Sequence, residues 1–412
     1  MNLWYDCEKK PITELLEFIV DNRGKTVPTT ETGHILIATN CIKNDSLYPK
    51  YEKIRFLSQE TYETFFRSHP LPGDIIFVNK GTPGRVCLVP EPVNFCIAQD
   101  MIALRANKKE VDNHYLFAVL RSPMIQAQIH NTYVGDVIPH FKKQFMDRLL
   151  IPIPSMSIQK RIGDIYYTLC DKIEVNRRIN EQLEELAQAL FKSWFVDFEP
   201  FKDGKFVESE LGMIPEGCTT ISLSKMANYL NGLAMQKFRP LEGEDGLPVL
   251  KIKELGQEAC NETSELCSPS LIDEKYIVDD GDVIFSWSGT LLVKIWCGGT
   301  CGLNQHLFKV TSEIYPKWFV YLWTKFHLDR FIRIAKDKAV TMGHIKRGEL
   351  DTSYAIVLND DKMKELDAIM SPIIEQFINN NIEIRKLSNL RDTLLPKLMS
   401  GEIDVEQFNV IE

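Results

Sequence analysis

Two groups of basic and polar residues recur at matching places in the two halves of the chain, and their chemistry suits nucleic-acid recognition. Lysine and arginine can donate to phosphate oxygens, whereas glutamine, histidine and threonine can reach base edges. The first-half candidates are Lys25, Lys80, Thr82, Arg85, Gln99, His140, Lys142 and Lys143. The second-half candidates are Lys251, Lys253, Thr290, Gln305, His306, His344, Lys346 and Arg347. Plainer roles stay open: solvated surface for a lysine or arginine, buried hydrogen bonding for the glutamines, and helix-start packing for His140 and His344.

Motifs for catalysis are missing from the same sequence. A methyltransferase acting on adenine N6 needs an Asp/Asn-Pro-Pro-aromatic motif, and neither DPP nor NPP occurs. The GKT at 24–26 resembles the end of a P-loop, but Ile19 stands where its first glycine is required. Neither a Pro-Asp dipeptide nor an HExxH motif occurs, and Cys297 and Cys301 lack a second pair at zinc spacing. We therefore expect no catalytic site and no metal.

The candidate residues belong to an internal duplication. GDIIFVNKGT at 73–82 reappears as GDVIFSWSGT at 281–290, displaced by 208 residues. HFKK at 140–143 matches HIKR at 344–347, displaced by 204, and this register continues without a gap to Leu190 and Leu394. Because chance similarity would not hold one register for so long, the repeat decides the architecture.

Each repeat begins with a globular segment, about 11–155 and 220–358. Short β-rich runs are predicted at 75–78, 86–89, 283–285 and 292–296, and short helices at 115–121 and 318–326. The motif GDxIF is shared, but the residues after it differ, with Val-Asn-Lys at 78–80 against Ser-Trp-Ser at 286–288. A common scaffold with altered loops is what two readers of different sequences would need.

Each globular segment is followed by a long amphipathic stretch, 158–195 and 361–399. Apolar residues recur at alternating spacings of three and four, which predicts a coiled-coil seam. The first stretch would be about 57 Å long as a helix. Pro372 predicts that the second helix restarts there, with Ser371 as its N-cap. Antiparallel pairing would bury both seams, with Asn176 and Asn380 fixing the register; the alternative is that each helix packs on its own domain.

The segment between the repeats, 195–218, has the Pro, Gly and charge content of a connector. Its aromatic residues, including Phe201, predict an anchor against the helices. We interpret Trp194, Phe195 and Phe198 as candidate partner-binding residues.

Composition limits the class of protein. A chain of 412 residues with 44% hydrophobic and 25% charged residues fits two globular domains. No apolar run could span a bilayer, no signal peptide is evident, and ten scattered cysteines fit a reducing cytoplasm. The net charge is −9, from 24 Lys+Arg against 25 Asp+Glu in residues 1–200 and 24 against 32 in the rest. DNA binding must then rest on local basic faces, with further phosphate neutralisation from a partner.

Two long motifs resemble a known family. WFVDFEPFKDGKFVESELGMIPEG at 194–217 resembles the central region of type I restriction–modification specificity subunits, and LRDTLLPKLMSGEIDV at 390–405 resembles their C-terminal ending. RGKTVPTT at 23–30 and both GDxIF strands are similar to the family's target-recognition domains. Cys218 departs from the pattern, since an aromatic residue is expected there.

The resemblance implies two target-recognition domains that each read half of a bipartite double-stranded DNA site. The helices would act as a spacer and as docking surfaces for two methyltransferase subunits, which bind S-adenosylmethionine and methylate adenine. Motor-nuclease restriction subunits would join for cleavage, and no membrane partner is implied. This chain would hold no cofactor of its own.

The resulting prediction is an α+β protein with a pseudo-twofold internal duplication. Two mixed α/β domains, 1–155 and 220–358, are joined by long helices at 156–197 and 359–412, the latter with a tail, and by a connector at 198–219. We expect a non-catalytic, cytoplasmic DNA-recognition subunit. There are two alternatives: a fused methyltransferase or nuclease, which the missing motifs disfavour, and a coiled-coil scaffold, which would not explain two similar domains with differing loops.

Overall fold

The computed structural model describes residues 7–22, 25–135, 138–337 and 345–405. The chain divides into two compact units. The first unit combines Met1–Val175 with Lys386–Glu412, and the second is Asn176–Arg385. Each unit therefore contains part of both long helices, α4 (Met156–Phe195) and α10 (Asp360–Ser400).

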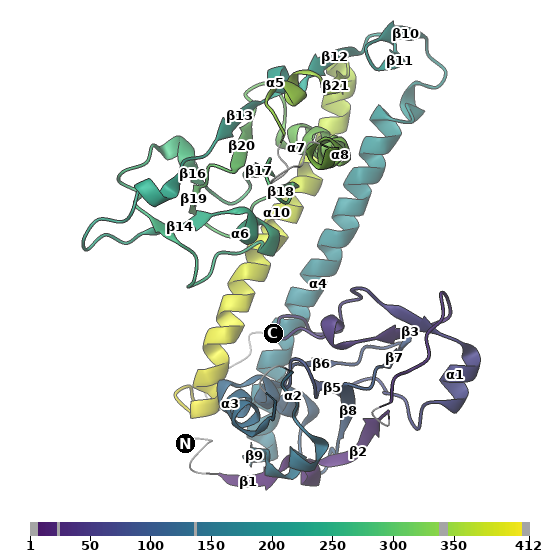
Figure 1. The fold of residues 1–412 in the computed structure, drawn as a ribbon, viewed down its shortest axis with the longest axis vertical. Coiled ribbons are helices and arrows are strands. Elements are labelled where there is room, and N and C mark those ends of the chain that lie inside the picture. The colour runs from purple at the N-terminus through teal and green to yellow at the C-terminus, as the bar shows by residue number, and fades with distance from the viewer. Residues whose placement is uncertain (1–6, 23–24, 136–137, 338–344, 406–412) are drawn as a thin grey trace. The chain divides into compact units, whose positions relative to one another are not determined.

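Two sheets form the centre of the first unit (Figure 1). The antiparallel sheet has the order β2-β8-β5-β6: Leu16–Asp21, Met101–Ala106, Ile75–Val78 and Val86–Leu88. The mixed sheet has the order β4-β3-β7: Arg55–Leu57, His34–Ile37 and Phe95–Ile97. β1 (Glu8–Pro11) pairs with β9 (Leu150–Ile153), and the helices are α1 (Gln59–Thr64), α2 (Asn113–Arg121) and α3 (Pro123–Thr132).

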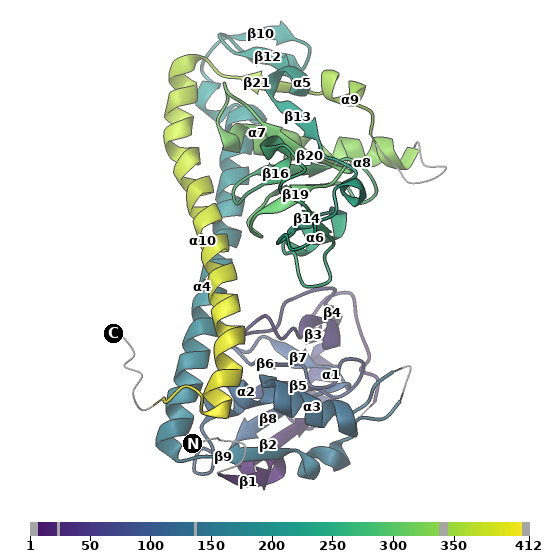
Figure 2. The same ribbon diagram turned by 90° about the vertical axis from the view of Figure 1, so that its left-hand side faces the viewer.

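The second unit has matching central sheets (Figure 2). Its antiparallel sheet has the order β13-β20-β17-β18: Asn228–Asn231, Leu307–Thr311, Val283–Ser286 and Leu292–Ile295. Its mixed sheet has the order β15-β14-β19-β16: Leu266–Cys267, Leu247–Leu250, Cys301–Leu303 and Ile277–Val278. Two further pairs are β12 (Thr219–Ser222) with β21 (Tyr354–Val357), and β10 (Phe206–Ser209) with β11 (Gly212–Pro215). The helices are α5 (Leu223–Met226), α6 (Ile252–Gln257), α7 (Lys317–Phe326), α8 (Leu328–Asp337) and α9 (Gly348–Asp351).

The GDxIF motif forms the strand that is buried on both faces in each unit. In β5, Ile75 and Phe77 face a core shared with α2, whereas Ile76 faces the core of the mixed sheet. β17 alternates in the same way, with Phe285 on the α7 side and Ile284 on the other. Successive strand residues point to opposite faces, so the consecutive apolar residues of each strand fill two cores at once. The predictions of strands at 75–78 and 283–285, and of helices at 115–121 and 318–326, are confirmed.

The long helices join these cores instead of standing apart from them. In the first unit, Ile162 and Tyr166 of α4 share a core with Leu395 and Leu398 of α10. In the second unit, the last turns of α4 and the first turns of α10 pack against α7. The two predicted long helices are therefore present, and packing on the domains, the alternative to mutual pairing, is observed.

The predicted restart at Pro372 is wrong, because α10 is continuous from Asp360 to Ser400. Ser371 does not act as an N-cap; its hydroxyl donates to the Asp367 carboxylate at 2.6 Å, inside the helix. Proline costs a helix one backbone donor, and here tertiary packing on both sides outweighs that loss. No helix in the described ranges is long and apolar enough to cross a membrane.

Candidate nucleic-acid interface

Three segments meet at the end of β5 in the first unit, and we call this place the loop junction. The Asn79 amide donates to the Asp100 carbonyl at 2.9 Å, and the Phe141 amide donates to the Asn79 carbonyl at 2.8 Å. Lys80 and His140 are partners in an isolated β-bridge. These bonds bring together the predicted residues Lys80, Gln99 and His140, which are distant in sequence.

The second unit has the same junction at the end of β17. The Trp287 amide donates to the His306 carbonyl at 3.4 Å, and the Ile345 amide donates to the Trp287 carbonyl at 3.1 Å. Trp287 thus has the backbone partners that Asn79 has in the first unit. The junction gathers Gln305, His306 and Lys346; the predicted His344 lies outside the described residues.

The turn at the first junction depends on glycine. Gly84 has a φ of +88°, and a Cβ added there would lie 2.9 Å from Oε1 of Gln126. The amide of Gln126 in turn donates to the Gly84 carbonyl at 2.9 Å. A side chain at this position would therefore be strained and would displace the contact between the loop and α3.

Several polar atoms at the two junctions are buried without a protein partner among the described residues. They are the Asn79 and Gln305 side-chain oxygens, the Thr82 hydroxyl and Nδ1 of His306. Buried polar groups are normally hydrogen-bonded, so such atoms are expected to bind water or a ligand. Gln305 and His306 interact only weakly with each other, with 3.4 Å between their Nε2 atoms.

Each repeat has two adjacent basic residues, Lys142-Lys143 and Lys346-Arg347. The two members of each pair have different surroundings, which the sequence did not indicate. Lys142 and Lys346 are exposed. Lys143 and Arg347 are exposed too, but each has a protein partner: Nζ of Lys143 lies 3.0 Å from an Asp21 carboxylate oxygen at the end of β2. The Arg347 guanidinium donates to the Tyr229 carbonyl of β13 at 2.9 Å. The second basic residue of each pair therefore holds the edge strand, and the first is the better candidate for phosphate.

The remaining predicted contacts are more scattered. Lys25, Lys253 and Thr290 are exposed, and Arg85 is half-buried beside the first junction. Lys251 is paired with Glu265, 2.8 Å from Nζ to the carboxylate oxygen, and this contact lowers the pKa of Glu265. Lys251 thus already has a counter-ion and is a weaker phosphate candidate than Lys346.

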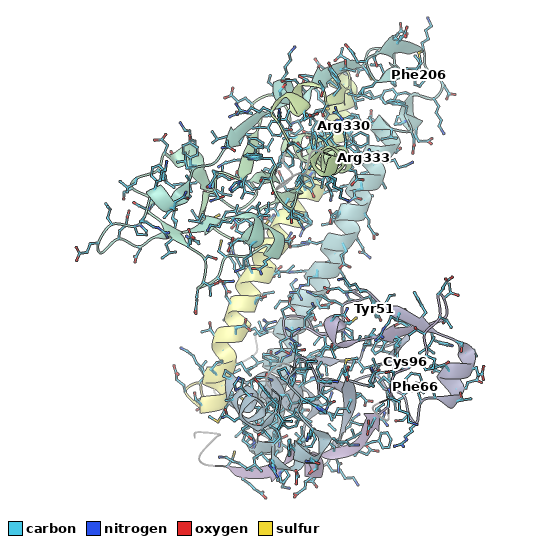
Figure 3. The ribbon with its side chains drawn as sticks, in the orientation of Figure 1. Tyr51, Phe66, Cys96, Phe206, Arg330 and Arg333 are labelled. Carbon is cyan, nitrogen blue, oxygen red and sulfur yellow. The ribbon has the colours of Figure 1, made fainter. Side chains whose placement is uncertain are left out.

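The aromatic partner-binding prediction needs correction. Trp194 and Phe195 are 7% and 2% exposed, and Phe195 packs against Trp318 and Trp323 in the second unit's own core. Phe198 is half-buried, with its ring 5.9 Å from that of Phe206 on β10. Phe206 is labelled in Figure 3. The anchor is real, but Trp194 and Phe195 are already covered and offer no free surface to a partner.

Inside the second unit, polar contacts link α4 to α10. The side-chain amide of Asn176 donates to the Glu383 carboxylate at 2.7 Å, and the side-chain amide of Asn380 donates to the side-chain oxygen of Asn180 at 2.9 Å. Asn180, which lies later in α4 than Asn176, contacts a residue that lies earlier in α10, so these segments run antiparallel. The predicted seam residues Asn176 and Asn380 are both buried, but they do not pair with each other.

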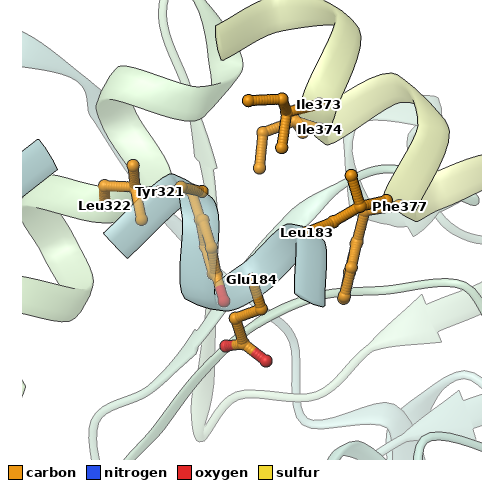
Figure 4. Close-up of a pocket in the computed structure, with 8 residues that line it drawn as sticks. Leu183, Glu184, Tyr321, Leu322, Ile373, Ile374 and Phe377 are labelled. Atoms are coloured by element: carbon orange, nitrogen blue, oxygen red, sulfur yellow. The ribbon is translucent and has the colours of Figure 1, made fainter. Parts of the chain in front are cut away.

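The apolar gap beside these contacts is not a ligand site. It is lined by Leu183, Glu184, Ala187, Tyr321, Leu322, Ile373, Ile374 and Phe377 (Figure 4). Its volume is ≈10 Å³, at the lower limit for one water molecule. The carboxylate of Glu184 at its edge pairs with Lys325. The gap is a packing feature of the helix contact.

No group of three or more metal-binding side chains occurs within the part of the chain that the structure describes. Burial raises the pKa of the Cys297 thiol to about 12, which disfavours the thiolate that a metal would bind. The structure adds a feature that the sequence prediction missed. An open hollow of ≈440 Å³ at the second junction is lined by Asn231, Trp287, Phe308, Ile345, Lys346 and Arg347. The signal in the sequence was Trp287 itself, the aromatic residue in the loop where the repeats differ.

Comparisons with known proteins point in one direction. Residues 6–185 match the sequence model described as the type I restriction modification DNA specificity domain. The type I restriction enzyme MjaIX specificity subunit of Methanocaldococcus jannaschii is 28% identical over 310 residues, covering 73% of this chain and 71% of that protein. The HindI specificity subunit of Haemophilus influenzae is 26% identical over 407 residues, covering 80% and 86%. The crystal structure of a type I S subunit from M. genitalium has a TM-score of 0.58 and 14% identity and covers 96% of both chains, so the fold is shared.

Proposed function

Because the chain belongs to the family of type I restriction–modification DNA specificity subunits, we propose that each of its two units reads one half of a bipartite DNA target. Its matched relatives are named specificity subunits, and the chain is the non-catalytic recognition component of its enzyme. The two units would be copies from an internal duplication.

One observation carries the proposal. Each unit has the same hydrogen-bonded junction at the end of its GDxIF strand, but the side chains there differ, with Asn79 in one and Trp287 in the other. A shared backbone frame with exchanged side chains is suited to reading two different sequences by base-edge contacts. Lys142 and Lys346 would position the duplex through phosphate contacts.

Partners would supply the chemistry. We propose that two methyltransferase subunits dock on the long helices, bind S-adenosylmethionine and methylate adenine, and that restriction subunits join them in the cytoplasm. With a net charge of −9, the isolated chain neutralises few phosphates, so it should bind DNA weakly until a methyltransferase subunit is added.

The decisive experiment maps methylated adenines in DNA exposed to the assembled methyltransferase. Two separated half-sites are expected, and replacing residues 79–84 by the loop of a relative with another target should change only one of them. Methylation without sequence preference would contradict the proposal. Binding of S-adenosylmethionine by the isolated chain would instead favour an enzyme.

The helices would also set the gap between half-sites. Four residues inserted near Gln182 lengthen a helix by about 6 Å and rotate the segment beyond the insertion by a little more than one turn. The methylated target should keep both half-sites and change the length of the unread gap. An unchanged gap would show that the helices do not act as a spacer.

A further inference from the structure

Trp287 is the feature that most distinguishes the second junction from the first. Asn79, its counterpart, is buried, and the side-chain amide of Asn79 donates to the Phe141 carbonyl at 3.3 Å. Trp287 is half-buried and forms part of the wall of the open hollow. At this position the first unit has a short polar side chain that hydrogen-bonds to the backbone. The second unit has a large aromatic ring that reaches the surface.

The indole is held in a fixed orientation. Its Nε1 donates to the side-chain oxygen of Asn231 at 2.9 Å, and its ring is stacked on Phe308 with centroids 5.8 Å apart. Ile345 extends the apolar wall of the hollow, and Lys346 adds a positive charge to it. An aromatic side chain positioned from two sides loses little conformational entropy when it binds.

The apolar wall of the hollow limits which groups of DNA Trp287 can contact favourably. In the DNA major groove, base edges present hydrogen-bond donors and acceptors, and the thymine 5-methyl group is the apolar exception. Lys346 is placed to bind an adjacent phosphate. We propose that Trp287 is a specificity-determining residue of the second unit and that its ring contacts a thymine methyl group in the half-site read by this unit. The inference rests on the proposed function.

The test uses the assembled methyltransferase complex and duplexes carrying its mapped target. Each thymine of the half-site read by the second unit, on either strand, is replaced in turn by deoxyuridine, which removes only the methyl group. At one position, affinity should fall about fourfold, as expected for loss of one buried methyl group. The same replacement should have no effect on a complex containing Trp287→Ala, and thymines of the other half-site should respond equally in both complexes.

A second measurement keeps Trp287 in place, so it does not require the Trp287→Ala variant to fold. Trp194, Trp296, Trp318 and Trp323 are at most 7% exposed, so Trp287 is the accessible tryptophan among the described residues. In a Trp4→Phe background, acrylamide should quench Trp287, and target duplex should protect it. A duplex with the second half-site scrambled should protect it less.

The outcomes separate the inference from the proposed function. If the complex recognises its target but no thymine is sensitive, or deoxyuridine acts equally with and without the indole, the inference is overturned. If Trp287 stays fully quenchable in the bound complex, it is overturned as well. If the complex shows no sequence preference, the proposed function itself fails.

Discussion

The buried amide pair between α4 and α10 in the second unit gives a prediction with a defined magnitude. Asn380 donates to Asn180 at 2.9 Å and accepts from the Gln376 amide at 2.6 Å. Asn180 also donates to the Phe377 carbonyl at 3.3 Å. Replacing Asn380 by alanine leaves the buried Asn180 oxygen without this partner, and an unsatisfied buried polar group costs about 1–3 kcal/mol; Gln376 is exposed, so water can replace its lost acceptor.

We therefore expect Asn380→Ala and Asn180→Ala each to lower the free energy of unfolding by about 2 kcal/mol. The double variant should lose less than the sum, by about 1 kcal/mol, because the shared bond can be lost only once. Urea unfolding followed by tryptophan fluorescence reports the second unit, which contains all the described tryptophans. Asn379→Ala, an exposed neighbour, is the matched control and should change stability by less than about 0.5 kcal/mol. Additive losses, or losses no larger than the control's, would refute the reasoning.

Three further predictions test the loop junctions and α10. Lys346→Ala should weaken DNA binding by the assembled complex and lower its salt slope by about 0.9, whereas Arg347→Ala should mainly reduce thermal stability; equal salt slopes would show that Lys346 does not touch phosphate. Pro372→Ala should raise the stability of the second unit by about 1–3 kcal/mol in urea unfolding, because it restores a helix donor; a loss would mean that the proline is required by its surroundings. Gln305→Ala should relax one base of one half-site and Gln99→Ala one base of the other, as read from methylated sequences; lower stability with intact specificity would make these residues structural.

Much of the fold could be predicted because a repeated sequence supplies its own alignment. GDxIF marked β5 and β17, and the apolar spacing marked α4 and α10 to within a few residues. Local patterns failed where packing decides the outcome. Pro372 is a helix breaker by propensity, yet contacts on both sides of it keep α10 continuous.

The candidate site was predicted less completely, because its geometry depends on partners far away in sequence. The repeat placed Lys346 and Arg347 together, but only the fold shows that Arg347 donates to a carbonyl of β13. The sequence made Trp194 a candidate partner-binding residue, whereas the fold buries it in the second unit's core. Residue type and spacing identify candidates, whereas the choice between ligand contact and internal contact requires the fold.

The first unit is built from both ends of the chain, and this affects the order in which the protein can fold during synthesis. Leu395, Leu398, Met399 and Val405 fill the same core as residues from the N-terminal half of the chain. On the ribosome, the second unit is complete once Arg385 has emerged, whereas the first unit, although begun earlier, stays open until the last segment is released. A premature stop near residue 385 would therefore damage the domain encoded farthest from it. Chain termination late in the gene should therefore impair folding of the N-terminal unit first.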